Sequence, residues 1–179
     1  SGSQLCAPLW HALPQLCESV SSLHAVWAPP LAASLAPEWR PLLYPTEQQR
    51  APLLHRELPP LPPISQHTDA AAAIMWIAIW LEQLREASYR LLALAITKCG
   101  ALAARLDAHE LLKAALLPNI ESQQPRHLTT LVRALLHPVL CTHPASNPAT
   151  FEPTRWLQLA TDLLPPVLAA LIVRMQQGV

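Results

Sequence analysis

The spacing of apolar and polar residues predicts a helix at the start of the chain. From Gln4 to Ala28, large apolar residues recur every three or four positions, as on one face of an amphipathic helix. They are Leu5, Leu9, Leu13, Leu16, Val20, Leu23 and Trp27. Pro14 lies inside this pattern and has no backbone N–H to donate, so we expect a break or kink there. The pattern predicts a short helix followed by a second one from about Pro14 to Trp27.

A second pattern predicts a central helix that ends at about Lys98. Its first part, Ala70 to Leu81, contains no polar residue, and a helix that is apolar on every side belongs inside a protein or a membrane. We therefore expect this part, with Trp76 and Trp80, to form the core. Its second part carries Glu82, Glu86 and Arg90 at intervals of four, which predicts one solvated face.

The rest of the chain predicts further helices, bounded by prolines and caps. Asp107 and Glu110 have the spacing of a capping box, and Pro118 ends that helix near Leu117. Pro125 and Pro153 each suit the first position of a helix. We expect further interruptions at the remaining prolines of this region, a bend or end at Pro138 and a break at Pro165 and Pro166.

Between these helical regions, residues 29–65 predict an extended arm. Prolines recur there too closely for a helix to propagate, ending in the run Leu58-Pro-Pro-Leu-Pro-Pro63, so polyproline II or irregular loop is the default. The division we expect is a cloning remnant at 1–3, a helical segment at 4–28, the proline-rich arm at 29–65 and a helical core at 66–179. We expect these parts to form one domain.

Composition narrows the class of protein. Apolar residues make up 51% of the 179 residues and charged residues 13%, half the usual share, with a net charge of zero. Such a chain either has a large core or keeps apolar surface for a partner, and its balanced charge does not suggest nucleic acid. Neither long apolar run reaches the ~18 to 20 residues that span a bilayer, so we expect no membrane span. The isolated cysteines suggest reduced thiols and an intracellular location, cytoplasmic or nuclear.

Candidate chemistry is sparse. His137, Cys141 and His143 form the best metal-like group, but a second pair of zinc ligands is missing. The chain has three glycines, far apart, and so no phosphate-binding loop, and we expect no cofactor and no enzymatic activity. A small enzyme or metal-binding protein that uses these three residues stays the first alternative.

A basic helical face is the second alternative. Arg126 and Arg133 are seven residues apart, so they share a face opposite the leucines of the same helix. This face could bind the phosphates of a nucleic acid, but the chain lacks interleaved aromatic residues and an excess of positive charge, which favours a solvated surface.

The favoured function is a non-catalytic protein–protein interaction module. We expect an all-α fold, an irregular bundle or a short array in which helix pairs from Asp107 onward resemble the end of a HEAT-like solenoid. Such a helical scaffold or adaptor domain of a larger complex would bind another protein subunit or self-associate. Tryptophan and neighbouring apolar residues are typical interface anchors, and the arm holds such a group. The predicted partner-binding residues are Trp39, Leu42, Leu43 and Tyr44.

Overall fold

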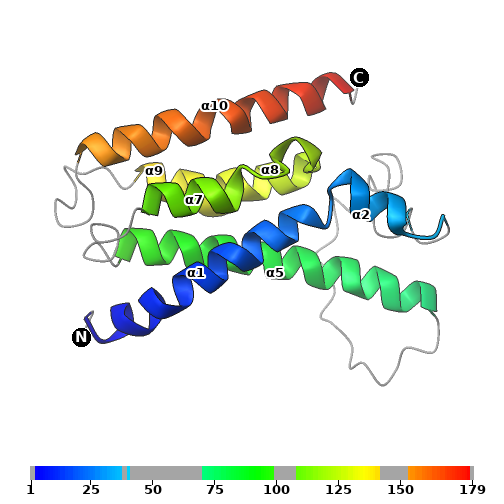
Figure 1. Cartoon of the computed structure of the whole chain (residues 1–179), viewed down its shortest axis with the longest axis horizontal. Coiled ribbons are helices and arrows are strands. Elements are labelled where there is room, and N and C mark those ends of the chain that lie inside the picture. Colours follow the sequence, from blue (N-terminus) through cyan, green and yellow to red (C-terminus); the bar gives the residue numbers. More distant parts are fainter. Residues whose placement is uncertain (1–2, 38–39, 41–69, 99–107, 142–152, 178–179) are drawn as a thin grey trace.

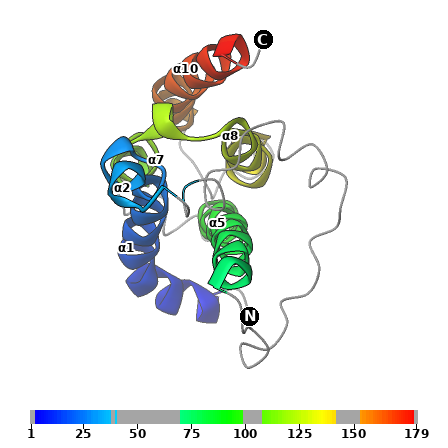
Figure 2. The same ribbon diagram turned by 90° about the vertical axis from the view of Figure 1, so that its right-hand side faces the viewer.

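A computed structural model describes residues 3–37, 40, 70–98, 108–141 and 153–177. Within these ranges every regular element is a helix, which confirms the predicted all-α class. The helices stack as a short HEAT-like array in which pairs of roughly antiparallel helices lie one above another (Figures 1 and 2).

The stack has two columns and a helix across its top. In the lowest pair, α1 (Ser3–Ala25) packs against α5 (Ala70–Lys98). In the next pair, α7 (Ala108–Leu116) packs on α1, and the continuous run of α8 (Pro125–Leu131), η3 (Val132–Leu136) and α9 (His137–Cys141) packs on α5. The long helix α10 (Pro153–Gln177) then covers α7 and α8 (Figure 2).

Leucines fill the space between these layers. Each layer contributes side chains that are completely or almost completely buried, and burial of one leucine stabilises the fold by about 1.5–3 kcal/mol. The most buried are Leu92 of α5, Leu116 of α7, Leu128 and Leu131 of α8, Leu135 of η3 and Leu163 of α10. The core therefore runs through the whole stack rather than around one helix.

The bounds of the central helix agree with the sequence, but its burial does not. Helix α5 ends at Lys98 as predicted. In its first part, however, Ile77 and Trp80 are 51% and 50% exposed, whereas Tyr89, Leu92 and other residues of the second part form the core. The prediction that Ala70–Leu81 is the buried centre is wrong for those two side chains, because α1 and the α8–α9 run bury mainly the second part of the helix.

Two predicted interruptions do not occur, one in α1 and one in α10. Helix α1 continues through Pro14, and α10 continues through Pro165 and Pro166. Pro14 and Pro165 lie on exposed sides of their helices, where water can satisfy the carbonyl groups that lack an N–H donor. In α10, Leu163 and Val167 are buried on either side of the proline pair, so packing holds both halves of the helix in line.

The helix also continues through Pro138, but its hydrogen-bonding pattern changes just before the proline. The residues before it, Val132–Leu136, form a π-helical segment in which the N–H of His137 donates to the carbonyl of Val132. A π-turn widens the helix locally, which relieves the clash that a proline ring causes in a regular α-helix. The helix therefore continues to Cys141, without the predicted end at Pro138.

The predicted arm begins with a helix. Pro29–Ser34 form α2, with prolines in its first two positions, where a missing N–H costs nothing. Arg40 caps the other end, donating from Nη2 to the carbonyl of Ala33 at 2.7 Å and from Nε to that of Leu35 at 2.9 Å. The expectation of an extended chain is wrong for α2, and residues 41–65 of the arm lie outside the described residues.

In the described part of the chain, no helix combines the length and the hydropathy that crossing a membrane requires.

Candidate functional site

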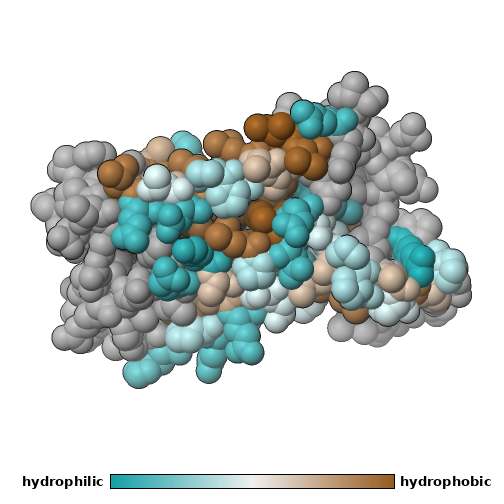
Figure 3. All heavy atoms as spheres, turned by 45° about the horizontal axis from the view of Figure 1, so that its top comes forward, coloured by the Kyte–Doolittle hydropathy of each residue, from teal (hydrophilic) through white to brown (hydrophobic). Residues whose placement is uncertain are grey.

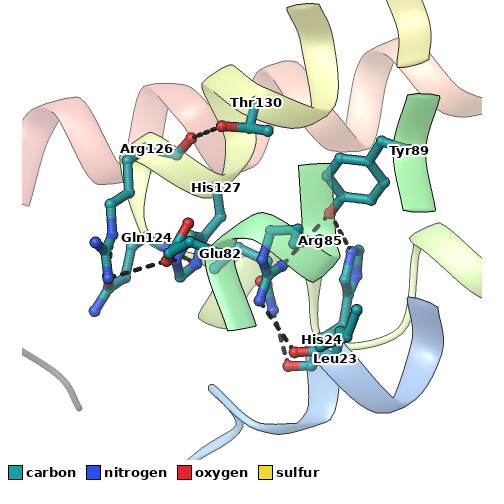
Figure 4. A network of polar contacts seen from close by, with 10 residues as sticks. Leu23, His24, Glu82, Arg85, Tyr89, Gln124, Arg126, His127 and Thr130 are labelled. Carbon is teal, nitrogen blue, oxygen red and sulfur yellow. Dashed lines mark hydrogen bonds and ion pairs between the residues drawn. The ribbon is translucent and has the colours of Figure 1, made fainter. Parts of the chain in front are cut away.

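The structure offers two kinds of candidate site, a buried polar cluster and exposed apolar helix faces. The cluster joins the end of α1 to α5, to the short helix η2 (Ile120–Ser122) and to the start of α8 (Figure 4). At its centre the Arg85 guanidinium is completely buried. It donates to Gln123 Oε1 at 2.8 Å and to the carbonyl of Leu23 at 3.1 Å, and it stacks 4.5 Å from the ring of Trp27.

A hydrogen-bonded pair extends the cluster on one side of Arg85. The hydroxyl of Tyr89 accepts from Arg85 Nη1 at 3.5 Å, so its own proton points to His24 Nε2, 2.7 Å away. Desolvation by burial, and then the positive charge of Arg85, lower the pKa of His24 to about 4. His24 is therefore neutral at physiological pH and accepts this hydrogen bond.

A histidine–carboxylate pair lies on the other side. The N–H of Gln124 donates to His127 Nδ1 at 3.4 Å, so the ring proton resides on Nε2 and points to Glu82 Oε1 at 2.5 Å. Burial lowers the pKa of His127 to about 3, which keeps the ring neutral. Glu82 is held ionised by its hydrogen bond to His127 and by Arg126, 3.1 Å away, which together outweigh desolvation and lower its pKa.

This cluster fixes helix positions and has no access to a substrate. His24, Arg85 and His127 are completely buried, and Gln123 and Tyr89 are almost so. A catalytic acid or base must reach the proton that it transfers, directly or through one water. The hydrogen bonds of the cluster connect α1, α5, η2 and α8, so its role is to hold these helices in fixed positions.

Only part of this arrangement agrees with the predictions from the sequence. Glu86 and Arg90 do form the predicted solvated pair, with 2.6 Å between Oε1 and Nη2. Glu82, expected on the same solvated face, points into the cluster instead, and Arg85 was not foreseen as a buried residue. The signal available was that Arg85 shares a helix face with Tyr89 and Leu92, four and seven residues later.

The exposed apolar faces are the second kind of candidate. The outer face of α10 presents Leu157, Leu168, Ile172 and Val173, all about half exposed or more. Figure 3 shows apolar side chains gathered over this upper part of the molecule. The outer face of α1 is polar by contrast, and its exposed residues include His11, Gln15, Glu18, Ser19 and Ser22. An apolar patch that a fold leaves open is typical of an interaction surface.

The predicted site residues fall in different places. Trp39, Leu42, Leu43 and Tyr44 lie outside the described residues, and so does His143. His137 and Cys141 are four residues apart on α9 and are both exposed, so they share a helix face. Among the described residues, no group of three side chains is placed to hold a metal ion.

The two arginines of the predicted nucleic-acid face are engaged by carboxylates. Arg126 contacts Glu82, and Arg133 Nη2 lies 3.2 Å from Glu86 Oε1. These contacts favour the solvated, ion-paired interpretation of this face.

The cysteines differ in environment. Cys17 is buried in the core, and burial raises the pKa of its thiol to about 11, which makes it an unreactive protonated thiol. Cys141, expected to be buried as well, is exposed on α9. Both are free thiols, as predicted.

Comparison with known proteins gives a family. The Exportin-5 family matches residues 5–178, which is nearly the whole chain. Protein HASTY 1 of Arabidopsis thaliana is 28% identical over 144 residues, covering 74% of this chain but 12% of that protein's length. No solved structure matches. Because the family match runs across the complete stack, from α1 to α10, this chain belongs to the Exportin-5 family.

Proposed function

We propose that the chain is a non-catalytic scaffold segment of the nucleocytoplasmic transport machinery and that it acts by binding another protein. The family name supports a role in export, and the HEAT-like stack supports a scaffold. The observation that carries the binding role is the open apolar face of α10, which presents Leu157, Leu168, Ile172 and Val173 to solvent. Exposed side chains of this size bind other proteins by the same burial that builds a core.

A paired variant tests the proposal in the protein that carries this chain, tagged and expressed in its own cells. Leu168→Asp with Ile172→Asp places charge on the α10 face, and Ser19→Asp with Ser22→Asp adds equal charge to the polar face of α1. We expect exchange between nucleus and cytoplasm by photobleaching, and a stoichiometric protein partner that the α10 variant alone loses. The proposal would be overturned if the protein stayed in one compartment, or if neither variant changed the binding of its partner.

The group Trp39, Leu42, Leu43 and Tyr44 is proposed as a further partner-binding element of the same scaffold. Tryptophan and tyrosine at an interface typically contribute the largest share of binding energy. Trp39→Ala and Leu43→Ala should each weaken partner capture about tenfold or more, with Leu31→Ala on the exposed side of α2 as the control. Unchanged capture in both variants would remove this group from the proposal.

The metal-binding alternative keeps one supporting observation. Because the helix continues through Pro138, His137 and Cys141 lie one turn apart and face solvent, which is a spacing that two metal ligands can use. Elemental analysis of the purified protein decides this alternative. One zinc per chain, lost in Cys141→Ser, would favour it, and the absence of stoichiometric zinc would exclude zinc binding.

A further inference from the structure

The helix α5 carries a second apolar face, opposite the one that forms the core. Exposed apolar residues follow one another along it at intervals of three, four, three, four and three residues. They are Ile77, Trp80, Leu84, Ala87, Leu91 and Leu94, and we call this row the α5 stripe. Five of the six are large side chains, exposed by 36% to 51%. In coiled coils, apolar residues at alternating intervals of three and four form the helix face that packs against a second helix.

The packing of the described helices does not explain the stripe. Tyr89, Leu92 and Ile96, on the other side of α5, already contact the core beneath α1 and the α8–α9 run. A solvated helix normally turns polar residues outward, whereas the stripe has none over five turns. The length and regularity of the row therefore indicate a surface that binds another molecule.

A positively charged edge runs along the stripe, on the side of α8. Arg90, one turn before Leu94, and Arg133 of η3 both contact the same oxygen of Glu86, at 2.6 and 3.2 Å. Their side chains are 68% and 67% exposed, so both guanidinium groups remain accessible from solvent. One carboxylate cannot neutralise two arginines, which leaves this edge positive in a chain of zero net charge.

The deeper part of the same edge adds to this charge. Arg126 contacts Glu82 at 3.1 Å, and the completely buried Arg85 lies one turn further along α5. His127 is neutral because burial lowers its pKa, so it adds no charge to this edge. Among the described residues, Arg90 and Arg133 at the surface of this edge share the one carboxylate of Glu86.

We propose that the α5 stripe binds an amphipathic helix of a partner protein whose apolar row is flanked by acidic residues. The apolar row fits the three–four spacing, and the acidic flank fits the edge formed by Arg90 and Arg133. A second copy of the chain would bring two positive edges together, and a nucleic acid would leave the stripe uncovered. The inference rests on the protein-binding function proposed above and names its site and the chemistry of its partner.

A pair of synthetic peptides tests the proposal with the purified chain. Each is a fluorescein-labelled 21-residue helix with leucine at the first and fourth positions of every heptad. One carries glutamate at the flanking positions and the other lysine. Fluorescence anisotropy should show the glutamate peptide binding at least tenfold more tightly than the lysine peptide, with the difference shrinking as salt is raised. Equal binding of the two peptides would overturn the proposed charge match.

Matched variants locate the bound peptide. Leu91→Ser with Leu94→Ser should weaken binding of the glutamate peptide at least tenfold, and Arg90→Ala should weaken it about threefold and reduce its salt dependence. Leu168→Ser with Ile172→Ser, on α10, is the control that removes equal apolar area elsewhere and should leave binding unchanged. Circular dichroism checks that each variant keeps its helices. Binding that survives the stripe variant, or that the α10 control loses, would overturn the proposed location.

Two further outcomes would assign the stripe to another occupant. Sedimentation that shows a dimer, abolished by the stripe variant, would assign it to a second copy of the chain. Displacement of the glutamate peptide by a 20-nucleotide single-stranded RNA at physiological salt would assign it to nucleic acid. If no peptide binds while the α10-dependent partner persists in cells, this inference fails and the proposed function stands. If the glutamate peptide binds but no α10-dependent partner is found in cells, the proposed function fails and this inference stands.

Discussion

The two halves of α5 differ in composition and in burial, and the more apolar half is the more exposed one. The half from Ala70 to Leu81 has no polar side chain, yet Ile77 and Trp80 are half exposed. The half that follows carries two glutamates and two arginines, yet it holds the centre of the core and a completely buried Arg85. The packing of the two halves differs, since α1 and the α8–α9 run bury mainly the second half. Burial in this fold is set by where helices stack and only secondarily by how apolar each turn is.

The largest expected effect comes from the buried charge of the second half. Arg85→Ala removes the hydrogen bonds to Gln123 and to the carbonyl of Leu23 and the stacking on Trp27. Loss of such a buried charged partner typically costs about 3–5 kcal/mol, and here it leaves several polar groups unsatisfied. Chemical denaturation should show this loss in the free energy of unfolding. Arg90→Ala, five residues later and exposed, is the control, and a similar loss in both variants would contradict a special role for the buried residue.

Two adjacent leucines sharpen the comparison within the second half. Leu92 is completely buried and Leu91 is 45% exposed on the α5 stripe. Leu92→Ala should lower the free energy of unfolding by about 3 kcal/mol because it leaves a cavity, and Leu91→Ala should lower it by less than about 1 kcal/mol. Both are measured by the same denaturant titration. Equal effects would mean that the stripe is part of the core.

Sequence reasoning located the helices of this protein better than it located their neighbours. The end of α5 at Lys98, the start of α8 at Pro125 and that of α10 at Pro153 follow from local rules of capping and proline geometry. The partners of Arg85 come from residues 62 and 38 positions away, and no local pattern encodes that meeting. The continuity of α10 through its proline pair likewise depends on the burial of side chains on either side of it, which is a property of the stack.

The polar cluster predicts a loss of stability in acid. In the folded protein the pKa of His24 is lowered to about 4, whereas in the unfolded chain it returns to its ordinary value of 6.5. Between pH 6.5 and 4 the unfolded state therefore binds a proton that the folded state does not, and the free energy of unfolding falls as the pH falls. The contribution of His24 is fully present above pH 6.5, and its loss by pH 4 is on the order of 2–3 kcal/mol.

A histidine-to-glutamine pair isolates this effect. His24→Gln keeps a polar side chain near Tyr89 but cannot be protonated, so its stability should vary less between pH 6.5 and 4. His127, whose pKa is lowered to about 3, continues to contribute a slope in the same direction in this variant. His11→Gln, on the exposed side of α1, is the control and should keep the full slope. Denaturant titrations at half-unit pH intervals measure both. A slope that His24→Gln leaves unchanged would contradict the assignment.

The smallest expected effect on stability lies in the first half of α5. Trp80→Ala removes one of the two tryptophans of that half, and a sequence-based view would rank it among the most damaging substitutions. Because the indole is half exposed, we expect a change in the free energy of unfolding within about 1 kcal/mol, far below that of Leu92→Ala. Its effect should instead appear in binding, as a weaker affinity for the glutamate-flanked peptide. A loss of several kcal/mol in stability, with peptide affinity unchanged, would show that this half belongs to the core and that the contrast between the two halves is not real.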